Sequence, residues 1–277
     1  MTPTRPGRPL PSRPRRAGRG RAGPAASENS DNRTATTGGP PARTLAGVSR
    51  RPYVLLSCAT SIDGYLDDAT GTRLVLSNEE DLDRVDAVRA ECDAILVGAN
   101  TIRRDDPRLL VRSEVRRDER VAAGLPPSPT KVTLTGSGDL DPDAAFFATG
   151  EVDKLVYCTT SALDKATERL AGVATVVDAG EPLDLARVLA DLADRGVRRL
   201  MVEGGVEVHT GFLVAGFADE LHLVVAPFFV GDSRAPRFAG DGAFPWRSGH
   251  PARLVEVRQI GNVVLLRYAL SEPDGGS

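Results

Sequence analysis

The sequence has few of the residues that metal sites and disulfide frameworks require. Three cysteines and three histidines are scattered over 277 residues. Cys58, Cys92 and Cys158 form no C-x-x-C pair and lie inside or beside apolar runs, so we expect buried, inert thiols in a reducing, cytoplasmic setting. The spacing of the histidines indicates no metal site.

Long hydrophobic runs and the motifs of nucleophilic enzymes are also missing. No stretch approaches about 18 uninterrupted apolar residues, so no membrane span is expected. The chain has no G-x-S-x-G elbow, no H-E-x-x-H and no cysteine with a convincing histidine partner. Hydride transfer fits these absences, because a cofactor then supplies the reactive bond and the protein supplies orientation.

Lysine is absent from the first 50 residues, which contain ten arginines, two acids and many prolines and glycines. Their formal charge is +8, which leaves −11 for the rest because the whole chain carries −3. Because this segment has few apolar residues, burial cannot offset the entropy lost on ordering. Residues 1–48 are therefore expected to be a disordered arm. The arm is either a tether for nucleic acid or an anionic surface, or else a solvated extension or a misplaced start. The arm has no aromatic residues on which bases could stack. This favours a solvated extension or a misplaced start, and we expect no nucleic-acid partner.

Short β-rich runs alternate with helical periodicity from residue 51 onward. The predicted strands are 53–56, 94–97, 131–134, 155–158, 175–177, 199–202 and 221–226. The predicted helices are 78–91, 162–170, 185–195 and 206–215. This alternation indicates βαβ crossovers and a largely parallel sheet covered by helices.

The C-terminal part has a different pattern. Residues 253–260 and 263–270 flank Gly261-Asn262, which predicts an antiparallel hairpin at one edge of the sheet. We therefore expect an α/β domain over residues 49–271 with a mixed, mostly parallel sheet, and a frayed tail at 272–277. The polar stretch 114–129 is expected to be a surface excursion.

A capping box is predicted at the start of the first long helix. Ser77 followed by Glu80 matches the pattern that satisfies free backbone donors at a helix N-terminus. Leu82 and Val85 recur at near-helical spacing, and Asp81 and Asp86 are expected on the other face.

Three segments that follow predicted strands are candidates for chemistry. The turn 61–64 is either a close approach to a ligand or a plain turn capped by Asp63. Residues 98–101 and 105–112 bring hydroxyl, carboxylate and guanidinium groups to the carboxyl edge of the sheet. There Arg89 and Arg112 either bind a phosphate or are solvated charges.

The third segment is the strand 201–203 followed by Gly204-Gly205 and a helix. Glycines let the backbone approach a pyrophosphate, and the helix N-terminus offers N–H donors. A tight strand-to-helix connection is the alternative. Glu203 ahead of the turn suits a hydroxyl or amino donor of a ligand.

Taken together in order, these segments resemble the pyrimidine reductases of riboflavin biosynthesis. The resemblance covers about residues 51–270. It rests on Ser77–Leu82, Arg89-Ala90, Asp93–Gly98, Thr101, Asp105–Leu109, Val202–Gly205, Val214–Gly216, Asp219–Leu221, Ala226-Pro227 and Gly231. It implies a dihydrofolate-reductase-like fold and an NADPH-dependent oxidoreductase. The reaction implied is reduction of a ribosylamino-pyrimidine 5′-phosphate to its ribitylamino form. That is the activity of a 5-amino-6-(5-phosphoribosylamino)uracil reductase or a 2,5-diamino-6-ribosylamino-pyrimidinone 5′-phosphate reductase.

The resemblance also assigns site residues by position. The NADPH contacts implied are Ala59, Thr101, Asp105 and the turn from Gly205 to Gly211. The residues singled out around the start of that turn are Gly204, Gly205, Val206, Glu207 and Val208. The substrate contacts implied are Ser57, Arg89, Leu109, Arg112 and Glu203. Asp105 and Glu203 are the candidate catalytic residues, and no metal is implied.

Ser57 and Tyr65 depart from the pattern of bifunctional bacterial members. Bifunctional members usually have lysine in place of Ser57, and a basic residue is common in the family in place of Tyr65. Ser57 favours the stand-alone type of reductase, whereas Tyr65 leaves the substrate more open. A same-fold reductase of another pteridine- or pyrimidine-like substrate, dihydrofolate included, is the alternative. A cytoplasmic homodimer is implied in either case.

Overall fold

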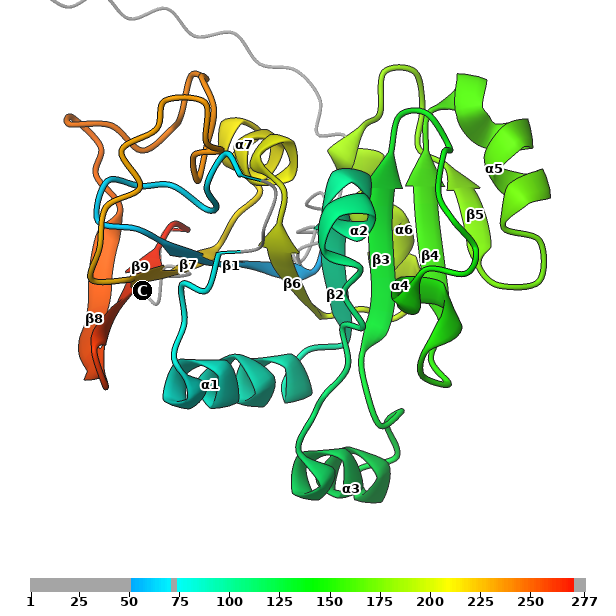
Figure 1. Ribbon diagram of the computed structural model, residues 1–277. Coiled ribbons are helices and arrows are strands. Elements are labelled where there is room, and N and C mark those ends of the chain that lie inside the picture. Colours follow the sequence, from blue (N-terminus) through cyan, green and yellow to red (C-terminus); the bar gives the residue numbers. More distant parts are fainter. Residues whose placement is uncertain (1–50, 71–73, 272–277) are drawn as a thin grey trace, which may run out of the picture. The chain divides into compact units, whose positions relative to one another are not determined.

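The fold is built on a nine-stranded mixed sheet with the strand order β5-β4-β3-β2-β6-β1-β7-β9-β8 (Figure 1). The structure, a computed structural model, describes residues 51–70 and 74–271. The predicted arm and the predicted tail lie outside these described residues.

The strands begin and end within two residues of their predicted positions, except that β1 continues to Thr60, four residues past its predicted end. They are β1 (Tyr53–Thr60), β2 (Ala94–Gly98), β3 (Thr130–Thr135), β4 (Lys154–Cys158), β5 (Thr175–Asp178), β6 (Arg199–Gly204), β7 (Glu220–Val225), β8 (Arg253–Ile260) and β9 (Val263–Ala269). The pairs among β1 to β7 are all parallel. β9 pairs antiparallel with both β7 and β8, so the mixed sheet and its C-terminal hairpin are confirmed.

The helices are α1 (Glu79–Ala90), α2 (Ala99–Asp105), α3 (Glu114–Ala122), α4 (Ala145–Ala148), α5 (Leu163–Arg169), α6 (Leu185–Asp194) and α7 (Val206–Val214), with a short 3₁₀ turn at Thr160–Ala162. Within the described ranges, no helix combines the length and the apolar character needed to cross a membrane.

The core lies on both faces of the sheet, as the alternation along β1 shows. Val54 and Leu56 join one cluster with Leu189 of α6 and Phe212 of α7. Leu55, whose side chain points to the opposite face, joins a second cluster that includes α2 and α4 residues. Burial on both faces explains why β2 reads as the continuous apolar run Ala-Ile-Leu-Val-Gly.

Three helices that the sequence pattern did not indicate are present: α2, α3 and α4. α3 occupies the segment predicted as a surface excursion. Ser113 caps it by accepting a hydrogen bond from the backbone of Arg116. Arg120 anchors it, because its buried guanidinium donates to the backbone oxygens of Ala90, Cys92 and Pro126.

The start and the polar face of α1 also differ from the prediction. Asn78, not Ser77, is the N-cap, and its side chain accepts from the backbone of Asp81. Asp81 and Asp86 are the buried residues of the helix. Asp86 is held there because it accepts hydrogen bonds from the backbone N–H groups of Arg112 and Ser113. These partners are distant in the sequence, so helical periodicity alone placed Asp86 on the wrong face.

Candidate active site

The carboxyl ends of β2, β3 and β6 open onto a cavity of about 630 Å³. Its walls come from α2, the start of α7, the end of β3 and the segment before α6, with Leu66, Asp67 and Pro236 from the loops after β1 and β7. Ligand sites in parallel α/β sheets lie at this edge, and the volume is in the range that binds cofactors.

The turn between β6 and α7, which contains Gly204 and Gly205, forms part of the cavity wall. Gly205 has φ +99°, a conformation that L side chains rarely adopt. No side chain caps the N-terminus of α7, so its first N–H groups have no side-chain acceptor at the cap position. Val206, Glu207 and Val208 of that first turn line the cavity. This is the geometry that binds a phosphate or diphosphate.

Thr101 of α2 lies across from this turn. Its Oγ1 is 3.6 Å from the position that a Cβ on Gly205 would take and 3.5 Å from that on Gly204. A Cβ on Gly98 would lie only 3.0 Å from Cγ2 of Val208, so glycine there permits close packing of α7 on β2. The structure thus brings together Thr101 and the turn from Gly204 to Val208.

Asp105, the last residue of α2, also lines the cavity and is exposed to it. Two neighbours that were not singled out from the sequence, Arg103 and Arg104, line it as well. Arg103 donates from Nη1 to Oδ1 of Asn100 at 2.6 Å. The wall of α2 therefore has positive charge beside the carboxylate of Asp105.

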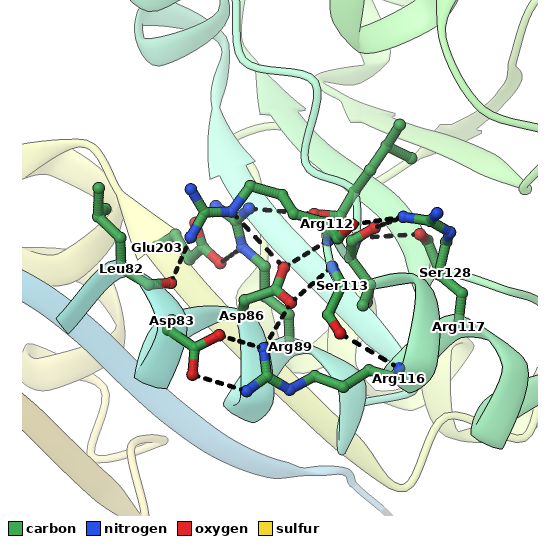
Figure 2. A network of polar contacts seen from close by, with 12 residues as sticks. Leu82, Asp83, Asp86, Arg89, Arg112, Ser113, Arg116, Arg117, Ser128 and Glu203 are labelled. Carbon is green, nitrogen blue, oxygen red and sulfur yellow. Dashed lines mark hydrogen bonds and ion pairs between the residues drawn. The ribbon is translucent and has the colours of Figure 1, made fainter. Parts of the chain in front are cut away.

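Arg89 and Glu203 form a bidentate ion pair, with Nε–Oε1 at 2.6 Å and Nη2–Oε2 at 2.5 Å (Figure 2). Both side chains are mostly buried. Burial disfavours the charged guanidinium, but the attraction of Glu203 raises the pKa of Arg89 above its ordinary value. Nη1 of Arg89 also donates to the backbone oxygen of Leu110. Two expected substrate contacts therefore bind each other and fix the turn after α2.

That turn contains backbone strain next to the predicted site. Asp106 and Leu109 have φ of +42° and +47°, although neither is glycine. Oδ1 of Asp106 accepts from the backbone N–H of Ala145 at 2.6 Å, and Leu109 is 3% exposed in the second core cluster. Strained backbone of this kind is typical of binding sites, where the surrounding contacts stabilise it.

Arg112 lies against α1 (Figure 2). It does not line the main cavity. Its Nη2 donates to the backbone oxygen of Leu82 at 2.6 Å, and its Nε is 3.8 Å from Oδ1 of Asp86. It borders a second, polar cavity of about 350 Å³ between α1 and the start of α3. Arg116 pairs with Asp83 and Asp86 on the same surface.

The two predicted residues of β1 lie in the sheet. Ser57 is 6% exposed and pairs in register with His222 of β7. Ala59 packs against the small cluster of Val224, Ile260, Val263 and Leu265. Neither residue lines the main cavity.

Asp63, a turn candidate from the sequence, connects the loops after β1 and β7. Its carboxylate accepts from the Ser61 hydroxyl at 2.6 Å and from the backbone N–H groups of Val230 and Gly231. The Ser61 hydrogen bond and these backbone donors lower the pKa of Asp63 to about 2. The carboxylate therefore holds together the two loops that contribute Leu66, Asp67 and Pro236 to the cavity wall.

The cavity also includes residues that sequence reasoning missed: Leu134, Thr135 and Gly136 at the end of β3, and Leu183 and Leu185 near the start of α6. β3 was predicted as a strand of the parallel sheet, and the carboxyl-edge rule applied to it would have indicated the first three. No local signal indicated the two leucines.

The fold and the cavity define an α/β protein with a nucleotide-sized site at the carboxyl edge of a parallel sheet. A family model described as the RibD C-terminal domain matches residues 52–266. The chain belongs to this family.

Curated relatives agree with the family assignment. The 2,5-diamino-6-ribosylamino-4(3H)-pyrimidinone 5′-phosphate reductase of Archaeoglobus fulgidus is 34% identical over 76% of this chain and 94% of the relative. The protein of the same name from Methanothermobacter thermautotrophicus is 37% identical over 79% of this chain and 99% of the relative. Riboflavin biosynthesis protein RibD of Bacillus amyloliquefaciens is 30% identical over 76% of this chain but 55% of that longer protein.

Solved structures show the same fold. A pyrimidine reductase-like protein from Corynebacterium diphtheriae superimposes with a TM-score of 0.69 at 24% identity, covering 80% of this chain and 93% of that one. A deaminase/reductase from Thermotoga maritima superimposes with a TM-score of 0.63, covering 79% of this chain and 57% of that one.

Proposed function

We propose that the protein is an NADPH-dependent reductase of riboflavin biosynthesis that converts a ribosylamino-pyrimidine 5′-phosphate to its ribitylamino form. The observation that carries the proposal is the diglycine turn at the N-terminus of α7, which opens onto a cavity of about 630 Å³. The names of the archaeal relatives, which align over nearly their whole length, support the substrate class.

The residues present fit a nicotinamide dinucleotide. Gly205 adopts φ +99° with no side chain on the turn, which leaves the backbone N–H groups at the start of α7 accessible to a diphosphate. Thr101, Val206 and Val208 would contact the dinucleotide, with Asp105 at the end of α2. When bound, the dihydronicotinamide ring supplies a hydride.

The reaction needs a hydride at C1′ of the sugar and a proton at the adjoining nitrogen. In the ring-opened substrate C1′ is the carbon of an imine, so adding the hydride to C1′ and the proton to nitrogen gives the ribitylamine. Asp105 borders the cavity and is the candidate for orienting the substrate or delivering that proton. Glu203 acts with Arg89, whose ion pair holds the strained turn at Leu109 beside the site.

Arg112 is proposed as a phosphate ligand. Its side chain is 56% exposed, with Nη2 on the backbone oxygen of Leu82 and Nε 3.8 Å from Oδ1 of Asp86, so the guanidinium can exchange these contacts for a sugar phosphate. Ser57 and Ala59 belong to β1 and do not line the cavity, so they would support the site through the sheet rather than by direct contact.

The proposal is tested by following NADPH oxidation with the ribosylamino-pyrimidine phosphate in its diamino and deaminated forms. Turnover of either form supports the proposal. If neither form is turned over, the substrate assignment is refuted. Dihydrofolate is the comparison substrate for the same-fold alternative. Arg112→Ala is expected to weaken turnover of the phosphorylated substrate far more than that of an unphosphorylated analogue.

We also propose that the enzyme is a cytoplasmic homodimer. The three cysteines are free thiols and two of them are buried, which suits a reducing compartment. Leu254 and Val257 of the edge strand β8 are 50% and 60% exposed, and Phe229 is 69% exposed. Such apolar surface favours self-association. Analytical ultracentrifugation tests the oligomeric state.

A further inference from the structure

Arg103 and Arg104 are adjacent in α2, and both line the main cavity, but they lie on different sides of the helix. Arg104 follows Thr101 by one turn, and Thr101 lies close to Gly204 and Gly205. Arg103 follows Asn100 by one turn and binds it. Arg104 therefore lies on the side of the diglycine turn, and Arg103 on the side of β3.

The guanidinium of Arg103 is held in place by three neutral oxygen atoms. Nη1 donates to Oδ1 of Asn100 at 2.6 Å, Nε to the backbone oxygen of Asp139 at 3.1 Å, and Nη2 to Oγ of Ser137 at 3.4 Å. A guanidinium has five N–H donors, so two remain for a ligand. Because none of these contacts is an ion pair, they orient the group without neutralising its charge.

The charge around Arg103 also favours an anion. The carboxylate of Asp139 is 3.3 Å from Nη1 of Arg169 and 3.8 Å from Nζ of Lys165. These two cations offset its charge, so Asp139 does not cancel the charge of Arg103. The hydroxyl of Ser137 adds a neutral donor at the same place.

The residues near Arg103 indicate which part of a dinucleotide it would bind. The N-terminus of α7 suits the diphosphate. Leu134, at the end of β3 just before the residues that Arg103 contacts, lines the cavity with Leu183 and Leu185 and provides apolar surface for a base. The adenosine half is therefore placed beside Arg103.

We propose that Arg103, oriented by Asn100 and assisted by Ser137, binds the 2′-phosphate of the adenosine half and gives the enzyme its preference for NADPH over NADH. The inference rests on the proposed function and adds the residue that selects the cofactor. Arg104, on the other side of α2, contributes charge to the cavity without distinguishing the two cofactors.

The test measures the dissociation constants of NADPH and NADH by titration calorimetry for the wild type, Arg103→Gln and Arg104→Gln. Losing a charge-assisted hydrogen bond to a phosphate weakens binding about 10- to 100-fold. Arg103→Gln is expected to weaken NADPH by this factor, with NADH unchanged within twofold. Arg104→Gln is expected to leave the ratio of the two constants as in the wild type. Arg253→Gln, an exposed position of β8 far from the cavity, is the control for both constants.

Binding of cofactor fragments distinguishes a lost 2′-phosphate contact from a folding defect, and it tests this proposal separately from the proposed function. Wild-type protein should bind adenosine 2′,5′-bisphosphate more tightly than 5′-AMP, and Arg103→Lys should keep part of that preference. If the wild type binds NADPH but Arg103→Gln keeps the wild-type ratio, or if the bisphosphate has no advantage, the inference is wrong and the reductase assignment stands. If the wild type binds neither dinucleotide, both fail.

Discussion

The ring of His209 should make the folded state sensitive to mild acid. This residue of α7 is fully buried, and neither ring nitrogen has a hydrogen-bond partner of ordinary geometry within the described part of the chain. Its ring lies 5.5 Å from that of Phe238. Burial lowers the pKa of His209 to about 4 from its usual 6.5, and the nearby backbone of Val202 and Phe238 offsets only part of this.

The sign of the effect follows from the direction of the shift. The unfolded chain binds a proton at His209 near pH 6.5, whereas the folded protein resists it until about pH 4. Stability is therefore lost as the pH falls through this window. One pKa unit corresponds to about 1.4 kcal/mol, so the full loss is about 3 kcal/mol, of which about 2 kcal/mol falls between pH 7 and pH 5.

The assay is urea unfolding at several pH values from 7 to 4.5 for the wild type, His209→Leu and His250→Gln. His250 is exposed and serves as the matched control. The free energy of unfolding of His209→Leu should fall by about 2 kcal/mol less than that of the wild type between pH 7 and pH 5. His250→Gln should parallel the wild type. Parallel curves for all three proteins would refute the account of His209 as a buried neutral ring.

Three further predictions concern the cavity and the buried charges. Gly205→Ala should weaken NADPH binding at least about tenfold, because an L side chain at φ +99° strains the turn by about 1–2 kcal/mol and displaces the first N–H groups of α7, which face the diphosphate. Gly172→Ala, at φ +79° in an open turn, carries similar strain and should bind NADPH normally in the same titration. Glu203→Gln should lower the free energy of unfolding by about 2 kcal/mol, since it leaves the mostly buried Arg89 without its counter-charge, and a loss below about 0.5 kcal/mol in urea would contradict this. Lys131 is fully buried with its ammonium donating to the backbone oxygens of Phe146 and Thr149, and burial lowers its pKa to about 8, so the folded protein loses this proton before the unfolded chain does. The wild type should therefore gain about 2 kcal/mol of stability relative to Lys131→Met between pH 7 and pH 10, and an unchanged difference would show that the pKa is not lowered.

The sheet could be predicted from the sequence because each strand has a local signal. β2 is a continuous apolar run bounded by polar residues, and the Gly261-Asn262 turn defines the hairpin of β8 and β9. These patterns depend on neighbouring residues only. The order of the strands does not, since β6 lies between β1 and β2 through contacts distant in the sequence.

The short helices were missed for the opposite reason. α2 has seven residues and begins directly at the end of β2, with no side-chain cap to mark its start. A helix of this length has almost no periodicity to detect, and tertiary contacts stabilise it. Asp86 was misplaced in the same way, because the backbone donors that bury it come from Arg112 and Ser113.

Some residues of the candidate site have a local sequence signal, whereas others are defined only by contacts distant in the sequence. The glycines of the turn after β6 and Thr101 could be named from the sequence, because strand ends and glycine pairs are local signals. The ion pair of Arg89 with Glu203, the position of Arg112 against α1 and the orientation of Arg103 depend on distant partners. These features needed the fold.

The central claim, that this cavity directs a hydride from NADPH to C1′ of a ribosylamino-pyrimidine phosphate, is tested most directly by isotope transfer. The enzyme is incubated with NADPH deuterated at C4 of the nicotinamide and with the substrate, and the product is analysed by mass spectrometry and NMR. One deuterium at C1′ of the ribityl chain is the predicted result, and Asp105→Asn should form the same product more slowly. A product with hydrogen from solvent at C1′, or no product from either pyrimidine, would contradict the claim.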